Sequence, residues 1–416
     1  MDAATQYLER IQELEVHDAR SLHFLESRNT DRNLLPNLRV LKWNTRREDT
    51  IKYIKPLLCP SLDILDVTSD EEDEMALPSL FRTCSSDSPN LTSIRFKNHG
   101  QYNEELKDSL SRALCGFKNL KCLTLNVGVG NDALQHLLMS PKLEELGLVT
   151  DQDQLVEFSP PPSDIPLRNA KQLDLSLSDL DPVVELLRPR DQKLCEVVLQ
   201  LRNLELPHAI RSLFNGLASQ TRESPLELFR IDSPDLHPRK HDKFYVLTFD
   251  TFRPLASLGN LHELSIQLEN PISLDDEELA QVARGWPLLQ VFELCCVRCW
   301  PAKRITFKGL LLLAAACPKL RHVALALDAR EVPTEIPVPV GSQFKSITTM
   351  KFPNSPVDNP GAAAVFLFTY FPSLTPAGES KRYRWEQALE DDPVRDREKW
   401  LDVWEFLEDE KSWADG

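Results

Sequence analysis

The feature that most constrains the fold of this chain is a short apolar pattern, L-x-x-L-x-L, which recurs along most of its 416 residues. Clear copies are LPNLRVLKW, CPSLDILDV, SPNLTSIRF, FKNLKCLTL and SPKLEELGL, and weaker copies extend the series in both directions. From Ile11 in the first copy to Ile347 in the last there are twelve steps over 336 residues, with a mean of 28 and a range of 23 to 35. Such a period is typical of a solenoid, in which each repeat contacts only its neighbours.

Each copy of the pattern predicts one strand. The last two apolar residues are two positions apart, so both side chains point to the same side of the strand, and the first apolar residue comes from the preceding turn. We therefore predict an α/β leucine-rich-repeat solenoid with a curved parallel sheet inside and helices outside, continuous over residues 11–352. A Rossmann-like open sheet is disfavoured, because thirteen strands would make it implausibly wide.

The segments between the strands carry helical patterns with start and stop signals. We expect Gly116 to be a C-cap glycine and Asn131 or Asp132 to be an N-cap. The predicted helices cover residues 102–116, 131–139, 181–188, 207–219, 275–286 and 307–317. The outer layer of the solenoid should therefore be helical.

The C-terminal segment differs from the repeats. We divide the chain into a solenoid of about 13 irregular repeats at residues 1–375 and a charged, Trp-rich helical segment at residues 376–416. Trp400, Leu401, Trp404 and Leu407 are spaced to lie on one side of a helix. This helix either caps the end of the solenoid or docks another protein.

Composition limits the classes of partner. The formal net charge of −16 argues against general binding to nucleic acids or anionic membranes, which rely on clustered Lys and Arg. The N-terminus lacks a signal-peptide pattern, and the longest apolar run, Leu310 to Cys317, is far shorter than a membrane span. Nine cysteines without framework spacing fit reduced thiols, so we expect a cytoplasmic or nuclear protein.

One short motif suggests an enzyme. Gly128, Gly130 and Ala133 match G-x-G-x-x-A, and Asp151 follows 23 residues after Gly128, near where a ribose-binding carboxylate would fall. A dinucleotide-binding enzyme built around Gly128 and Gly130 is therefore one alternative. The other repeats use the same strand-loop-helix order without any G-x-G, which favours an ordinary repeat loop.

Other chemical sites have little support in the sequence. Cys295, Cys296 and Cys299 in CCVRCW, with Cys317 and His322 further on, supply one zinc-like pair but no second pair. Core thiols explain them better. Nucleophile-elbow and P-loop patterns do not occur, so we expect no catalytic residue, no cofactor and no bound metal.

The repeats resemble the leucine-rich-repeat region of F-box proteins, in particular a large fungal group. The stretches that carry the resemblance are LLPNLRVLKWN, CPSLDILDV, SPNLTSIRF and CPKLRHVAL, and it spans roughly residues 8–375. In that family an N-terminal F-box docks on the Skp-type adaptor of a cullin ubiquitin ligase, while the repeats hold the substrate. The resemblance implies a protein-binding module that acts as a substrate receptor; a stand-alone scaffold is the alternative.

Two features depart from the family pattern. The first repeat strand begins near Ile11 and no F-box-like stretch precedes it, so we expect the chain to bind a Skp-type adaptor only if an F-box is encoded upstream. Many repeat families also place an asparagine three residues after L-x-L, whereas this sequence has other residues there, from which we expect irregular loops. These residues are Arg46, Asp70, His99, Gly128 and Asp151.

The residues that alternate with the buried positions should form the binding surface. They point away from the core and tile the concave face of the sheet, where a protein partner would bind. The candidate residues are Lys42, Asn44, Asp66, Arg95, Lys97, Thr124, Asp174, Arg230 and Asp232. Because cations gather at Lys42, Arg95 and Lys97, a partner with an acidic segment should dock towards the first repeats.

Overall fold

Thirteen L-x-x-L-x-L segments were predicted to be strands, and all thirteen are strands in a computed structural model of the chain. The structure describes residues 8–17, 34–45, 51–69, 76–99, 104–149, 165–187, 192–203, 205–219, 226–233, 245–296, 304–339, 341–375 and 394–414. Two compact units are formed, unit 1 from residues 1–177 with 191–194 and unit 2 from residues 178–190 with 195–416. Continuity of one solenoid over residues 11–352 stays a prediction.

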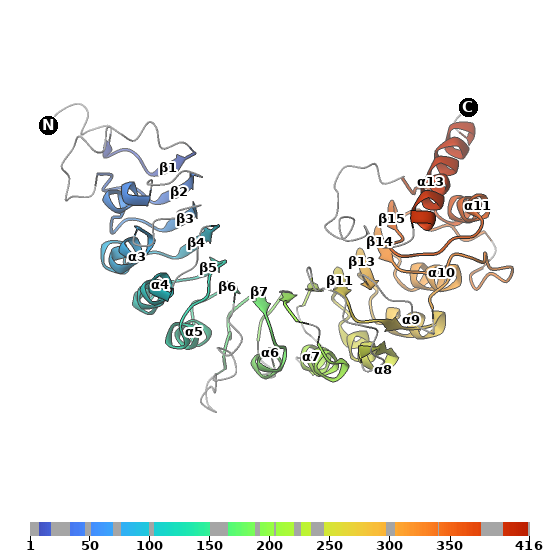
Figure 1. Ribbon diagram of the computed structural model, residues 1–416, viewed down its shortest axis with the longest axis horizontal. Coiled ribbons are helices and arrows are strands. Elements are labelled where there is room, and N and C mark those ends of the chain that lie inside the picture. The colour runs from blue at the N-terminus through green and yellow to red at the C-terminus, as the bar shows by residue number, and fades with distance from the viewer. Residues whose placement is uncertain are drawn as a thin grey trace. The chain divides into compact units, whose positions relative to one another are not determined.

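Unit 1 is a run of parallel strands in chain order, with helices along one side of them (Figure 1). The strands are β1 (Glu13–Val16), β2 (Val40–Thr45), β3 (Ile64–Ser69), β4 (Ser93–Asn98), β5 (Cys122–Leu125), β6 (Glu145–Val149) and β7 (Gln172–Leu177). The helical elements are η2 (Ile51–Tyr53), η3 (Lys55–Leu57), α3 (Ala76–Asp87), α4 (Glu104–Gly116) and α5 (Asn131–Leu138).

Unit 2 repeats this plan, again with its helices along one side of its strands (Figure 1). Its main strands are β8 (Glu196–Leu201), β9 (Leu228–Asp232), β11 (Glu263–Leu268), β13 (Val291–Cys296), β14 (His322–Leu325) and β15 (Thr349–Lys351), and β10 (Leu247–Thr248) pairs with β12 (Ile272–Ser273). The helices are α6 (Asp181–Leu186), α7 (Pro207–Ser219), α8 (Phe249–Phe252), η5 (Arg253–Ser257), α9 (Asp276–Ala283), α10 (Phe307–Ala316), α11 (Pro360–Tyr370) and α13 (Val394–Ala414). The predicted leucine-rich-repeat fold class is thereby confirmed.

The core consists of the apolar positions of the repeat. From Leu38 onward, the three apolar residues of each repeat pattern are buried, and only Ile11 and Leu14 at the first strand are half-buried. Aromatic side chains fill the space between strand and helix, as where Phe81 of α3 meets Phe96 of β4 edge to face with ring centroids 5.0 Å apart. Each strand is thus held by the helix side of its own and adjacent repeats.

The recurrent Pro-x-Leu turns explain why strands stay in register. In CPSL the Leu62 amide donates to the Cys59 carbonyl, with 3.1 Å between nitrogen and oxygen, which closes a tight turn before β3. The residue before the first apolar position bonds back to the previous repeat: the Asn90 side chain donates to the Pro60 carbonyl at 2.8 Å and the Asn169 side chain to the Pro141 carbonyl at 2.8 Å. A polar side chain before the first apolar position, Leu91 or Ala170, therefore fixes the spacing between successive repeats.

The predicted helices exist, but two capping predictions were wrong. Gly116 ends α4 without a left-handed backbone; instead, a Cβ there would lie 2.8 Å from Ser85 Cβ, so glycine permits close packing of α4 on α3. Helix α5 begins at Asn131, which makes Gly130 its N-cap. By contrast, Asp275 forms a complete capping box with Glu278 at the start of α9. Helices α3, α8 and α11 were not predicted.

Helix α13 packs on the last repeat of unit 2. Trp400 packs on Phe352, directly after β15, with ring centroids 4.6 Å apart, and its indole N–H donates to the Ser355 carbonyl at 2.7 Å. Trp400, Val403 and Leu407 are buried, whereas Leu401 is 55% exposed. Leu401 was assigned to the wrong side, because the packed stripe follows i, i+3, i+7. These contacts support a capping role, which stays a prediction.

Among the described helices, none has both the length and the apolar character needed to cross a bilayer.

Candidate functional site

The candidate surface is the open face of each sheet, which we define as the face opposite the helices. Residues on this face alternate with the buried ones, so neighbouring strands bring them into rows. In unit 1 the central row follows the strand register from β1 to β7. Its members are Glu15, Lys42, Asp66, Arg95, Thr124, Gly147 and Asp174.

A second row lies one step further along the same strands. Asn44 is registered with Thr68, and Thr68 with Lys97. Asn44, Arg95, Lys97 and Asp174 are exposed, and the remaining candidates of unit 1 are half-buried. The structure thus brings Lys42, Asn44, Asp66, Arg95, Lys97, Thr124 and Asp174 onto one face of unit 1.

The cations of this face differ in their partners. Lys42 Nζ lies 3.0 Å from Glu13 Oε1 on the neighbouring strand, and this hydrogen bond raises the pKa of Lys42. Lys42 therefore does not add a free charge, contrary to what its sequence position suggested. Arg95 and Lys97 are exposed on the same strand, β4, and in the described part of the chain neither side chain makes an ion pair or hydrogen bond. The positive end of the face is therefore reduced to Arg95 and Lys97.

Beyond β4 the face is lined by small residues. Gly147 is buried in the central row, and a Cβ there would lie 3.2 Å from Thr124 Cγ2. Cys122 precedes Thr124 on the same strand, and burial together with the Glu145 carboxylate raises the pKa of its thiol to about 11. This thiol therefore stays protonated at neutral pH, which makes it a small surface group and not a nucleophile.

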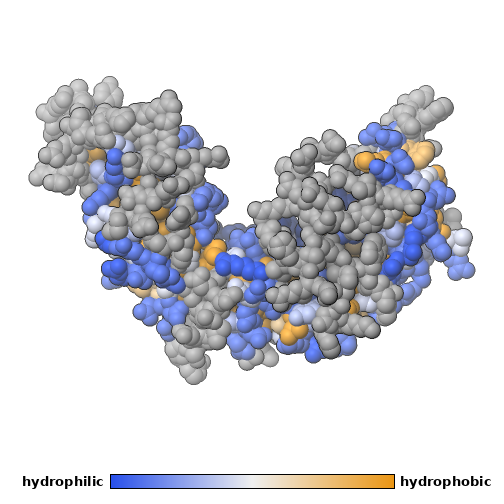
Figure 2. Space-filling model, viewed as in Figure 1, coloured by the Kyte–Doolittle hydropathy of each residue, from blue (hydrophilic) through white to orange (hydrophobic). Residues whose placement is uncertain are grey.

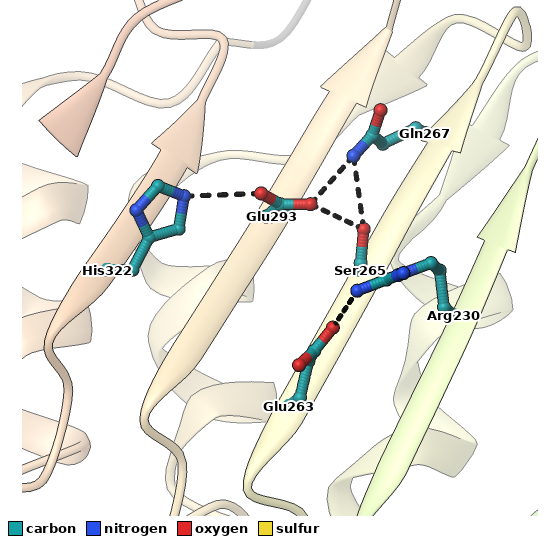
Figure 3. A network of polar contacts seen from close by, with 6 residues as sticks. All are labelled: Arg230, Glu263, Ser265, Gln267, Glu293 and His322. Atoms are coloured by element: carbon teal, nitrogen blue, oxygen red, sulfur yellow. Dashed lines mark hydrogen bonds and ion pairs between the residues drawn. The ribbon is translucent and has the colours of Figure 1, made fainter. Parts of the chain in front are cut away.

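The open face of unit 2 carries a closed polar network (Figure 3). Glu293 of β13 accepts hydrogen bonds from Ser265 Oγ at 2.7 Å and Gln267 Nε2 at 2.7 Å, and its other oxygen lies 3.2 Å from His322 Nε2. Despite burial, which acts the other way, these bonds lower the pKa of Glu293 to about 2. The carboxylate is thus held ionised and almost out of solvent, with 13% of its side chain exposed.

Arg230 and Asp232 lie beside this network on β9. The Arg230 guanidinium pairs with Glu263 of β11, and strand register sets Arg230 opposite Ser265 and Asp232 opposite Gln267. These two candidates therefore lie on the open face of unit 2, whereas the other seven lie on the open face of unit 1. Arg230 is committed to an internal ion pair.

Sequence reasoning missed Glu293 and His322. Both occupy outward strand positions, at the E of VFEL and the H of RHVAL, so the period-2 pattern placed them on this face but could not show that they meet. The usable signal is the strand register: Glu293 shares one row with Ser265 and Ala324, and His322 lies two residues before Ala324, on the same face of β14.

The structure around Gly130 does not fit a dinucleotide site. The Gly130 amide, which would face a pyrophosphate, donates to Ser111 Oγ at 2.7 Å, and Val127, Val129 and Ala133 around it are buried. The loop is therefore packed against α4. Asp151, Arg46 and Asp70 lie outside the described residues.

The loop asparagines follow a different register from the one expected. Asn126 directly follows β5. Its side-chain Nδ2 donates to the Asn98 backbone carbonyl at 2.8 Å, and its side-chain Oδ1 accepts from the Asn98 backbone N–H at 2.8 Å. Asn203 likewise donates to the Ser178 carbonyl at 3.0 Å. Asparagine thus does link neighbouring loops, but from one residue after the L-x-L at Asn126 and four residues after it at Asn203, instead of three.

In the described part of the chain, the cysteines near CCVRCW do not come together to form a metal site. Cys295 and Cys317 are buried, burial raises the pKa of both thiols, and His322 is engaged by Glu293. Within the described ranges, no three His, Cys, Asp or Glu side chains are placed to hold a metal ion. Cys299 and the side chain of Cys296 lie outside those ranges.

Comparisons with known proteins add little. No protein-family model matches the chain, and no curated protein matches it. Among solved structures it is similar to a chain of the crystal structure of a Rad7 and Elc1 complex in yeast, with 15% sequence identity and a TM-score of 0.44, covering 81% of this chain and 75% of that chain. A likeness of this strength carries no argument about function.

Proposed function

We propose that this chain is a protein-binding repeat module whose partner docks on the open face of unit 1. The observation that carries the proposal is the pair of exposed cations, Arg95 and Lys97, on one strand of a face whose other described cation, Lys42, is paired with Glu13. Forming an ion pair with a partner costs little where no internal bond must be broken. The partner should therefore offer an acidic segment to β4.

The remaining candidates define the footprint around these cations. Asp66 and Thr124 flank Arg95 in register, and Asn44 lies two strands from Lys97 in the second row. The small surface at Thr124 and Gly147 gives an apolar or backbone group of the partner room to approach the sheet. Asp174 lies three strands from Arg95, about 14 Å away at the usual spacing between strands.

Charge reversal tests the proposal. The variant Arg95→Glu/Lys97→Glu should lose the proteins captured by the wild-type chain from a cell lysate, since two attractive contacts become repulsive. The matched control is Arg112→Glu/Lys118→Glu, which changes the net charge equally at exposed positions of α4 and the turn after it. Circular dichroism checks both folds. An unchanged set of captured proteins in the first variant, or an equal loss in the control, would contradict the proposal.

The finer role, substrate recognition within a cullin-type ubiquitin ligase, is supported by the resemblance of the repeats to those of F-box proteins. It is tested by tagging the protein at its C-terminus in its native cells, so that any upstream coding sequence is retained. If an F-box is encoded upstream, we expect a Skp-type adaptor and a cullin among the captured proteins, and neither with the 416-residue chain alone. A stand-alone scaffold predicts that both are missing from the native capture as well.

A further inference from the structure

Helix α11 is unusual because its solvent-facing side is apolar. Its sequence, PGAAAVFLFTY, contains no charged residue. Val365 is 57% exposed, and Ala362, Phe368 and Thr369 continue the same stripe at helical spacing. The Thr369 hydroxyl donates to the Val365 carbonyl of its own helix at 2.7 Å, so the polar atom is used internally.

Other helices show that such a face is not required by the fold. On α4 the exposed stripe consists of Glu104, Asp108 and Arg112, the usual charged side of an amphipathic helix. A helix that is apolar on all sides is expected where both sides are covered. The apolar stripe of α11 is therefore typical of an interaction surface.

Helix α13 extends this surface, because it packs beside α11. Lys399 donates to the Val357 carbonyl at 2.7 Å, which identifies the side of α13 that faces the loop just before α11. Phe406 follows Lys399 by seven residues, nearly two full turns, and so projects from that same side. Phe406 is 49% exposed, and hydrophobic atoms reach the surface along α13 (Figure 2).

The exposed charged side chains that the structure describes on α13 are acidic. Glu398, Asp402, Glu405 and Glu408 are exposed, and the one cation in residues 398–408, Lys399, is bonded to the loop before α11. Asp402 precedes Phe406 by four residues and therefore lies next to it on the helix surface. An apolar strip bordered by carboxylates complements a basic, apolar ligand.

We infer that α11 and α13 form a docking surface for a basic amphipathic helix of a partner protein. The apolar side of that helix would cover Val365, Phe368 and Phe406, and its Lys or Arg residues would pair with Asp402 and its acidic neighbours. This surface belongs to unit 2, and the inference does not depend on the function proposed for the open face of unit 1.

The test uses the full chain and a fluorescein-labelled Leu/Lys peptide designed as an amphipathic helix of about four turns. We expect saturable binding by fluorescence anisotropy that Val365→Ser/Phe406→Ser weakens about tenfold or more. The control Leu206→Ser removes another exposed apolar side chain of unit 2 and should bind like the wild type. A peptide of the same composition with alternating Leu and Lys should bind more weakly than the helix.

Two results would overturn the inference. One is equal binding of both peptides, or equal affinity of the double variant and the wild type, because attraction to the acidic chain in general would then explain binding. The other is a concentration-dependent dimer of the wild type in sedimentation velocity that Val365→Ser/Phe406→Ser abolishes, because a second copy of this chain would then be the occupant. Circular dichroism confirms that each variant is folded.

Discussion

The open faces of the two units have the same strand pattern but use their charges differently. In unit 2, Arg230 pairs with Glu263, and Glu293 is enclosed by Ser265, Gln267 and His322. In unit 1, Arg95 and Lys97 have no such partner within the described residues. A charged side chain that is already bonded within the protein adds to stability, but it must break those bonds to contact a ligand. An exposed charged side chain without such bonds adds little to stability and can pair with a binding partner directly.

The largest expected effects are those of core substitutions on stability. They should be equal in the two units, because the units differ only in how the charged residues of their open faces are paired. Leu146→Asp in unit 1 and Leu264→Asp in unit 2 each bury a charge in a core position that is 1% exposed or less, at a cost of at least several kcal/mol. Thermal unfolding followed by circular dichroism should show loss of the cooperative transition in both. The volume-conserving control Leu146→Met should melt nearly normally. A normal melt of either Asp variant would refute the core assignment.

On the open faces the two units should diverge. Glu293→Ala leaves the fully buried Ser265 hydroxyl without its acceptor and the Gln267 amide with only its 3.2 Å bond to Ser265 Oγ, which should cost about 2–4 kcal/mol. Arg95→Ala should change the free energy of unfolding by about 0.5 kcal/mol or less. Urea unfolding measures both. Similar costs for the two variants would remove the distinction between the units.

The pH dependence of stability sharpens the same contrast. Because the folded pKa of Glu293 is about 2, against an ordinary 4.5, its contribution is complete well above 4.5 and is lost as the pH falls from about 4.5 towards 2. The stability advantage of the wild type over Glu293→Gln should therefore shrink by about 2 kcal/mol between pH 6 and pH 3. The unit 1 counterpart, Thr124→Val, should differ from the wild type by the same amount at both values. A pH-independent Glu293→Gln effect would contradict the network.

A smaller effect is expected at Glu205, a carboxyl of unit 2 away from the open face. Burial, together with the charges of Asp179 and Asp181, raises its pKa to about 7. The ionised form is thus disfavoured in the folded chain, so stability should fall as the pH rises from about 4.5 to 7. Glu205→Gln should be more stable than the wild type by roughly 1 kcal/mol at pH 8, after allowance for solvent screening, and equal at pH 4. Glu185→Gln on α6 is the exposed control; a destabilised Glu205→Gln at pH 8 would refute the assignment.

The repeat period predicted the strands well because every strand must bury the same apolar positions against its neighbours. It also placed Lys42, Arg95 and Lys97 on one face, since side-chain alternation follows directly from strand geometry. The period could not show that Glu13 reaches Lys42, or that His322 reaches Glu293, because both pairings depend on register and side-chain length across strands about 28 residues apart. Helix α11 was missed for a related reason: its apolar residues have no amphipathic period to detect.

The most direct test of the contrast is lysine footprinting of the wild-type chain, free and in complex with the proteins it captures. Lys97 lies on the open face of unit 1, and Lys351 occupies the central row of the open face of unit 2. Brief acetylation followed by mass spectrometry reports the accessibility of both in one sample. The account predicts that complex formation protects Lys97 and leaves Lys351 at its rate in the free chain. Protection of Lys351 with Lys97 unchanged, or equal protection of both, would contradict it.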